Sequence, residues 1–155
     1  MEIRSFADYL RGLDDAALLR LFTHRADLIS PVPPDMASLA VRASSAPSLA
    51  RAIDALNAWQ FQVLEACAVA SEPFTEKIIA ALTDKPAIFV IPGLIERGLI
   101  YPADDGLRMP TTLRELLGNE VAQLGPHSMA KLNLKKLSDA PPSAKKILEA
   151  MAWGP

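Results

Sequence analysis

Apolar residues recur every three or four positions through most of this chain, which is the spacing of helices that bury one face. The clearest pattern follows Asn57, where Trp59, Val63 and Cys67 share one face and further apolar residues lie between them. The Asn57 side chain suits the cap that begins such a helix. Because the stretch is apolar on most sides, we expect it to lie at the centre of a core.

A short second helix is predicted after a break at Pro73. Thr75 is a residue type that commonly caps a helix start. The helix that follows it would bury Ile78, Ile79 and Leu82.

A third helix is expected from Asp84 to Arg97, with Gly98 as its natural stop. Pro92 and Gly93 interrupt it, because proline in a helix interior costs about 3 kcal/mol and glycine about 1 kcal/mol. We therefore expect a kink or a helix start near Pro92.

A β-hairpin is predicted next. The apolar runs 99–101 and 107–109 flank a turn that contains Asp-Gly, which is typical of hairpins. Thr111 or Thr112 can cap a final helix. Because three helices followed by a hairpin are the order of a winged helix, we predict a winged-helix unit over residues 57–118.

Residues 1–56 are predicted to form a helical N-terminal segment that packs on this unit. Four residues suited to cap helices each precede apolar residues at helical spacing. These caps are Ser5, Asp14, Asp35 and Ser48. The proline-rich run 31–34 forces an extended connection between the helices.

After this body the pattern changes. Residues 119–140 have few periodic signals and are expected to form a linker. Residues 141–155 begin with two prolines and carry Ile147, Leu148 and Met151 at helical spacing, so we expect a partial second helical unit, cut short at the C-terminus. The predicted fold class is mainly α with a small β-wing, and the chain is expected to be a piece of a longer protein.

Composition narrows the function classes. Half of the 155 residues are hydrophobic and the mean hydropathy is +0.17, so the chain can build a core. No apolar run approaches the ~20 residues of a membrane helix, and the N-terminus lacks a signal peptide's apolar core. We therefore expect a cytoplasmic, bacterial-type protein with no membrane contact.

Nothing in the sequence points to catalysis. The chain has one cysteine and two histidines, which excludes a thiolate metal cluster, and it has no G-x-x-x-x-G-K-[ST] phosphate loop. Cys67 is expected to be a buried, inert thiol, and Arg25 with Asp27 to fix a helix end. We predict no catalytic residues, no metal, no cofactor and no small-molecule substrate.

Positive charge is concentrated near the C-terminus. Residues 131–155 carry five lysines and two acids, whereas residues 1–130 carry 11 basic and 16 acidic residues. These lysines suit weak, salt-sensitive contact with DNA phosphates, and they also suit a solvated linker. The candidate nucleic-acid contacts are Lys131, Lys135, Lys136, Lys145 and Lys146 in this cluster, Arg97 in the third helix, Arg108 in the wing, and Lys77 and Lys85 as backbone contacts.

The alternative is a protein-interaction or oligomerisation module that makes no DNA contact. The third helix is almost entirely apolar, unlike a helix that reads base edges with basic and amide side chains. Ile88, Phe89 and Ile91 would form the contact surface if they are exposed.

Two runs of sequence resemble one family. They are the run from Arg25 to Arg42, with its Arg-x-Asp-Leu-x-x-Pro-x-Pro pattern, and the ending 147–155. Both resemble the N-terminal region of actinobacterial helicase-associated proteins, grouped with the N-terminal domain of XPB-type helicases. The resemblance implies tandem winged-helix units in a longer protein with a DNA-related role, although Pro92-Gly93 departs from a smooth third helix. The leading expectation is thus a non-enzymatic winged-helix module that positions DNA or a partner. The partner would be another protein or the remainder of a longer chain.

Overall fold

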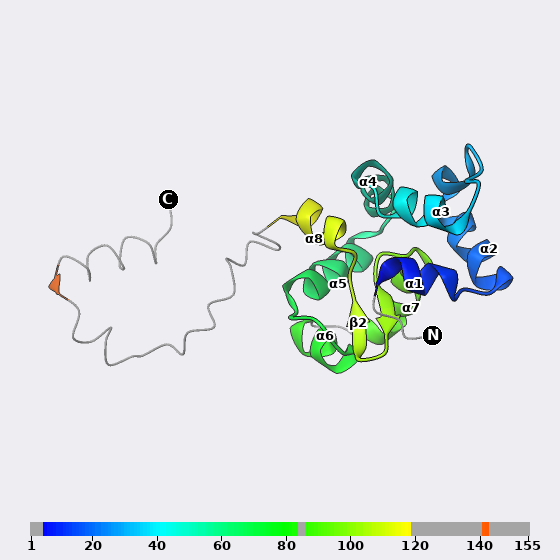
Figure 1. Ribbon diagram of the computed structural model, residues 1–155. Coiled ribbons are helices and arrows are strands. Elements are labelled where there is room, and N and C mark those ends of the chain that lie inside the picture. The colour runs from blue at the N-terminus through cyan, green and yellow to red at the C-terminus, as the bar shows by residue number, and fades with distance from the viewer. Residues whose placement is uncertain (1–4, 84–85, 119–140, 143–155) are drawn as a thin grey trace.

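A computed structural model describes residues 5–83, 86–118 and 141–142. These residues are mainly helical with one small antiparallel sheet, which confirms the predicted mainly α class (Figure 1). The elements are α1 (Phe6–Arg11), α2 (Asp15–His24), the 3-10 helix η1 (Ala26–Ile29), α3 (Met36–Ala43), α4 (Ala46–Asp54), α5 (Ala58–Val69), α6 (Glu76–Leu82), the 3-10 helix η2 (Ala87–Phe89), α7 (Ile91–Glu96), β1 (Tyr101–Ala103), β2 (Gly106–Arg108) and α8 (Thr111–Leu117).

Side-chain caps begin the first helices as the sequence predicts. Ser5, Asp14 and Asp35 each accept a hydrogen bond from the backbone N–H three residues later. The prediction that Ser48 begins a helix is wrong, because α4 already begins at Ala46. Ser48 is instead buried within α4, where its hydroxyl accepts a hydrogen bond from the buried guanidinium of Arg25.

The helix after Asn57 is the central one. Asn57 and Gln60 form a capping box, in which each side chain accepts from the other residue's backbone N–H, at 2.9 and 3.1 Å. Val63, Leu64 and Cys67 are fully buried, and α5 contacts α6, α7 and α8. The predicted position of this helix at the centre of a core is confirmed.

The predicted hairpin is present, with its strands closer to the turn than expected. Tyr101 pairs with Arg108, and Ala103 with Gly106. An isolated antiparallel bridge joins Phe74, just before α6, to Leu107. Gly106 has φ of +143°, and a Cβ there would lie 3.0 Å from the Phe74 carbonyl oxygen, so the bridge requires a glycine at this position.

Two predictions about helix ends and faces are wrong. Pro110, not Thr111 or Thr112, is the cap position of α8, and no side chain caps its start. Ile78 and Leu82 of α6 are exposed, because this seven-residue helix buries a single side chain, Ile79.

The third helix is divided, as Pro92-Gly93 indicates. The 3-10 turn η2 ends at Phe89, and α7 begins at Ile91 with Pro92 in its first turn. A proline there costs no hydrogen bond, because the first N–H groups of a helix lack helical partners. Helix α7 ends at Glu96, and Gly98, with φ of +64°, follows its C-cap residue Arg97, close to the expected stop.

The buried apolar side chains form two clusters that meet at α7. One cluster surrounds α5, and the other joins α1, α2 and α3 to Tyr101 of the hairpin. Ile95 packs against both clusters. Figure 1 shows α2, α3 and α4 along one side of the described body and α6 with the hairpin on the other.

Candidate interaction surfaces

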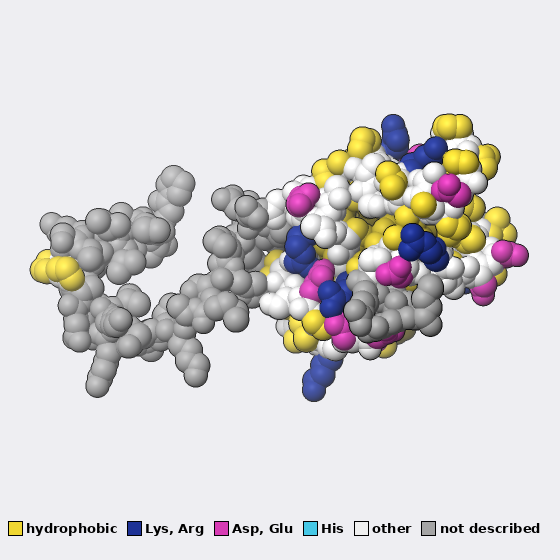
Figure 2. Space-filling view, in the orientation of Figure 1, with side chains coloured by type: hydrophobic (Ala, Val, Ile, Leu, Met, Phe, Trp, Pro, Cys, Tyr) yellow, Lys and Arg dark blue, Asp and Glu magenta, His cyan; other side chains and the backbone are white. Residues whose placement is uncertain are grey.

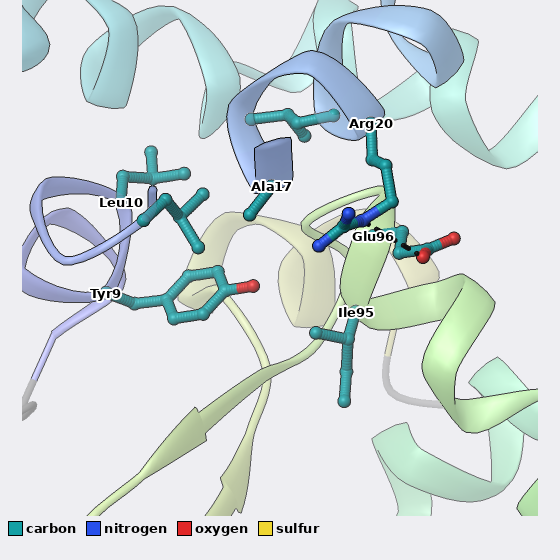
Figure 3. Close-up of a pocket in the computed structure, with 8 residues that line it drawn as sticks. Tyr9, Leu10, Ala17, Arg20, Ile95 and Glu96 are labelled. Carbon is teal, nitrogen blue, oxygen red and sulfur yellow. Dashed lines mark ion pairs between the residues drawn. The ribbon is translucent and has the colours of Figure 1, made fainter. Parts of the chain in front are cut away.

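Helix α7, the regular part of the predicted third helix, is packed on two sides. Ile91 and Leu94 of α7 are fully buried, and α7 contacts both α5 and α2. Glu96 pairs with Arg20 of α2 at 3.3 Å (Figure 3). It also lies 3.6 Å from Nε2 of His24. The N-terminal segment therefore packs against one side of α7.

Arg97, a predicted nucleic-acid contact, is engaged within the protein. Its Nη1 donates to the carbonyl oxygen of Gly93 at 2.9 Å. Its own carbonyl oxygen accepts a hydrogen bond from Arg25 at 3.3 Å. The first of these contacts occupies one of the five N–H donors of the guanidinium.

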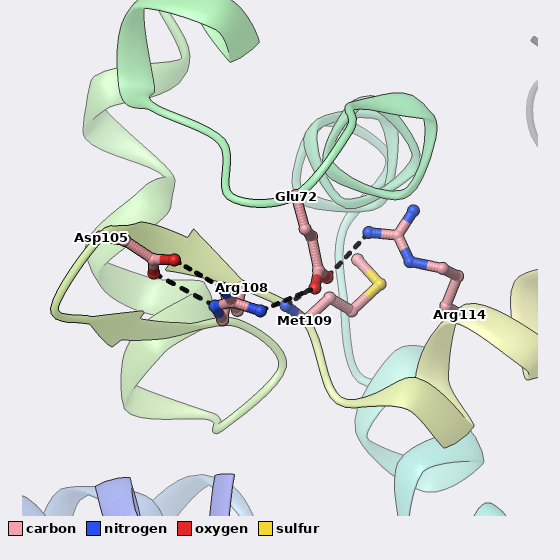
Figure 4. A network of polar contacts seen from close by, with 5 residues as sticks. All are labelled: Glu72, Asp105, Arg108, Met109 and Arg114. Carbon is pink, nitrogen blue, oxygen red and sulfur yellow. Dashed lines mark hydrogen bonds and ion pairs between the residues drawn. The ribbon is translucent and has the colours of Figure 1, made fainter. Parts of the chain in front are cut away.

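Arg108, the basic residue of the predicted wing, is also paired. It donates two hydrogen bonds to Asp105, at 3.2 and 2.6 Å, and lies 3.9 Å from Glu72 (Figure 4). The hydrogen bond from Arg108 holds the pKa of Asp105 below its usual value, and the same bond raises the pKa of Arg108. Both groups are thus charged, and their charges offset each other at the hairpin.

Glu72 ties the hairpin to two other parts of the chain. One of its carboxylate oxygens accepts from the backbone N–H of Met109 and from Arg114 of α8, both at 2.9 Å (Figure 4). Arg114 also donates to the carbonyl oxygen of Ala68 in α5. The sequence gives no signal of this network, because its members lie as far as 42 residues apart.

The predicted basic contacts are not gathered on one element. Lys77 is exposed on α6, whereas Arg97 follows α7 and Arg108 lies on β2. Lys85 and the C-terminal lysines Lys131, Lys135, Lys136, Lys145 and Lys146 lie outside the described residues. The described residues therefore present no assembled basic surface from these candidates.

An apolar surface spans α6 and η2, which contact each other. Its side chains are Ile78, Leu82, Ile88 and Phe89, with exposed fractions of 43%, 49%, 54% and 84%. We call these four residues the α6–η2 surface. Ile91, which the sequence assigns to this surface, is the first residue of α7 and is fully buried, so its assignment is wrong. The apolar spacing of Ile78, Ile79 and Leu82 predicts burial for all three, so the sequence does not distinguish the exposed pair from the buried Ile79.

Arg25 is a structural centre, as the sequence predicts. Its side chain is 1% exposed and its Nη2 donates to the carbonyl oxygen of Ala43 at 2.8 Å and to the Ser48 hydroxyl at 2.6 Å. The Ser48 hydroxyl in turn donates to the Asp27 carboxylate. Burial lowers the pKa of Arg25 to about 10. The Arg-x-Asp pattern thus holds α2, α3 and α4 together around one guanidinium.

Two hollows lie near α2. The smaller, of about 80 Å³, lies between α1, α2 and α7 and includes Tyr9, Arg20 and Glu96 (Figure 3). Its volume suits a few water molecules, since each takes ~30 Å³ in the liquid, and it is far below the size of a substrate pocket. The larger, of about 290 Å³, lies between α2 and α3 and is almost entirely apolar.

The prediction that Cys67 is buried is confirmed. Cys67 is fully buried, and burial raises the pKa of its thiol to about 12, so it holds its proton. Within the described part of the chain, no three His, Cys, Asp or Glu residues are grouped to hold a metal ion. None of the helices described there has the length and apolar character to cross a membrane.

No family model, curated protein or solved structure matches this chain.

Proposed function

We propose that this chain is a non-enzymatic winged-helix module that works through protein contact at the α6–η2 surface. The observation that carries the proposal is the contrast between α7, enclosed by α5 and α2, and Phe89, which is 84% exposed beside three other apolar side chains. Groups of exposed apolar side chains commonly mark interaction sites.

The order of elements supports a winged helix. Helix α5 is followed by a bridging residue at Phe74, then α6, then η2 with α7, and then the hairpin. The isolated bridge from Phe74 to Leu107 lies at the position, before the second helix, where such units place a short third strand. The resemblance of residues 25–42 and 147–155 would place this module in a helicase-associated protein.

The partner that we propose for the α6–η2 surface is a second copy of this chain. Most soluble oligomers are two-fold dimers, in which the same patch of both subunits forms the contact. The surface presents apolar side chains from two adjoining elements, so two copies related by a two-fold axis can bury both sets. Four side chains per copy suit a small, reversible interface.

Sedimentation velocity over a wide range of protein concentration tests this function. We expect the mean sedimentation coefficient to rise with concentration for the natural chain, and to stay at the monomer value for Phe89→Asp. Val41→Asp is the matched control, because Val41 is a 74% exposed apolar residue on α3, outside this surface. Monomeric behaviour of the natural chain at every concentration would contradict the proposal.

DNA positioning is the second candidate function, favoured by the lysines of residues 131–146. The winged helix would then be a support, and the lysines would contact phosphates. Fluorescence anisotropy with duplex, forked and single-stranded DNA at ~50 and ~200 mM salt tests it. Salt-sensitive binding lost in Lys135→Glu/Lys136→Glu, with Arg97→Ala unaffected, would favour this candidate, whereas no binding at low salt would exclude it.

A further inference from the structure

The larger hollow is an apolar groove on the opposite side of the molecule from α6. It has a volume of about 290 Å³. Its apolar lining includes Leu18 and Phe22 of α2, Ile29 and Val32 of the connection, and Met36 and Leu39 of α3. We call it the α2–α3 groove. Figure 2 shows hydrophobic side chains gathered at the upper right, where Figure 1 places α2, α3 and the turn that joins them.

The lining decides what kind of ligand fits. Among the residues that line the groove, Asp35 is the one with a charged side chain, and the exposed lining is almost wholly apolar. Small-molecule sites usually combine an apolar wall with several converging polar groups, and they occupy about 300–1,000 Å³. A groove near the lower limit of that range, without those groups, better suits apolar side chains from one face of a helix.

We propose that the α2–α3 groove binds this chain's own residues 143–155, through Ile147, Leu148 and Met151. The spacing of these residues places all three on one face of a helix. Pro142, the described residue that precedes the segment, has helical backbone. This proposal is independent of the α6–η2 surface and of its partner.

The chain is long enough for this contact within one molecule. Helix α8 ends at Leu117, and residues 119–142 connect it to the proposed segment. Extended residues span about 3.3–3.6 Å each, so this connection reaches up to about 80 Å. A domain of ~100 residues has a radius of gyration of ~13 Å, so every face of the described body lies within reach.

Charge favours the same contact. Lys145 and Lys146 directly precede the apolar residues of the segment. Asp35 lies at the groove, and the backbone hydrogen bond from Ser38 holds its pKa below the usual value, so it is ionised at neutral pH. Asp15 lies one turn before Leu18 on α2 and is exposed. The groove thus has one acidic group in its lining, Asp35, and a second, Asp15, one helical turn from Leu18 in the lining, for the two lysines.

Paramagnetic relaxation in the full chain tests the proposal. A spin label on Ala37→Cys stands beside the groove, because Ala37 is exposed on α3 next to Met36. The natural Cys67 does not compete for the label, because it is buried and holds its proton. We expect loss of the amide signals of residues 143–155 with this label. A label on Lys77→Cys of α6 should leave them intact.

Matched variants separate docking from chance proximity. Val32→Glu places a charge in the groove and should restore the lost signals, whereas Val41→Glu should not. These two valines are 77% and 74% exposed, so neither change threatens the core. Lys145→Glu/Lys146→Glu should likewise restore the signals, and Lys131→Glu/Lys135→Glu should not.

Two results would overturn the proposal. The first is equal signal for residues 143–155 with the labels at positions 37 and 77. The second is signal loss in a mixture of two kinds of chain, one isotope-labelled without a spin label and the other spin-labelled without isotopes. Such a loss reports contact between molecules.

Discussion

Nη2 of Arg25 lies 2.6 Å from the Ser48 hydroxyl, and this hydrogen bond joins residues 23 positions apart inside the N-terminal segment. The Ser48 hydroxyl in turn donates a hydrogen bond to the Asp27 carboxylate. Burying a guanidinium is costly unless it is hydrogen-bonded, and Nη1 and Nη2 of Arg25 have partners whereas its buried Nε has none. The arrangement of α2, α3 and α4 therefore depends on the partners of Nη1 and Nη2.

Arg25→Met should destabilise the chain strongly. It keeps much of the side-chain volume but leaves the Ala43 and Arg97 carbonyls and the Ser48 hydroxyl oxygen without their donor, which costs about 3–5 kcal/mol. Urea unfolding followed by far-UV circular dichroism measures the loss. Arg51→Met on the exposed face of α4 is the control and should change stability by less than ~0.5 kcal/mol. Equal losses in both variants would contradict this account.

Glu72→Gln should loosen the base of the hairpin. The amide oxygen can still accept from Met109, but the ion pairs with Arg114 and Arg108 are lost. Because these pairs are partly exposed, we expect about 1 kcal/mol, decreasing at high salt. Glu76→Gln, on exposed α6, is the matched control. Hydrogen exchange at the Met109 amide should become faster only in the first variant, and unchanged exchange would count against the network.

Much of the fold follows from local sequence signals. The caps at Ser5, Asp14, Asp35 and Asn57 each act within three residues, so the sequence predicts these helix starts correctly. The Asp-Gly turn and the stop at Gly98 are equally local.

The errors in the sequence analysis come from contacts between distant residues. Ser48 resembles a helix cap, but its hydroxyl accepts a hydrogen bond from Arg25, and the helix begins earlier, at Ala46. Ile91 resembles part of an exposed apolar surface, but α7 turns it into the core. The covering of α7 by α2 through Arg20 and Glu96 depends on packing between segments 76 residues apart, which no periodicity reveals.

Ile95→Ala should weaken both apolar clusters together. Ile95 is partly buried and packs against both, so its loss removes contacts where they meet. We expect a cost near the lower end of the range for large-to-small core substitutions, about 2 kcal/mol. Ile88→Ala, at a 54% exposed position, should cost less than ~1 kcal/mol. Thermal unfolding measures the difference. A similar fall in Tm for the two variants would show that α7 does not join the clusters.

Alkaline pH should destabilise the chain through Cys67. Its thiol pKa rises from 9.0 to about 12 on folding, so between these values the unfolded chain loses this proton and the folded chain keeps it. The contribution of Cys67 to the free energy of unfolding is therefore fully present below pH ~9 and falls above it. The loss is about 1.4 kcal/mol at one pH unit above the pKa of the unfolded chain. Cys67→Ala should show a shallower fall in unfolding free energy between pH ~8 and ~10.5. Parallel curves for the two proteins would contradict the buried thiol.

The central claim is that the module makes its contacts through the α6–η2 surface, and amide chemical shifts recorded over a dilution series test it most directly. We predict concentration-dependent shifts at Ile78, Leu82, Ile88 and Phe89, with the amides of α7 unchanged. Shifts that are absent at every concentration, or that concentrate on α7 or on the α2–α3 groove, would contradict the account.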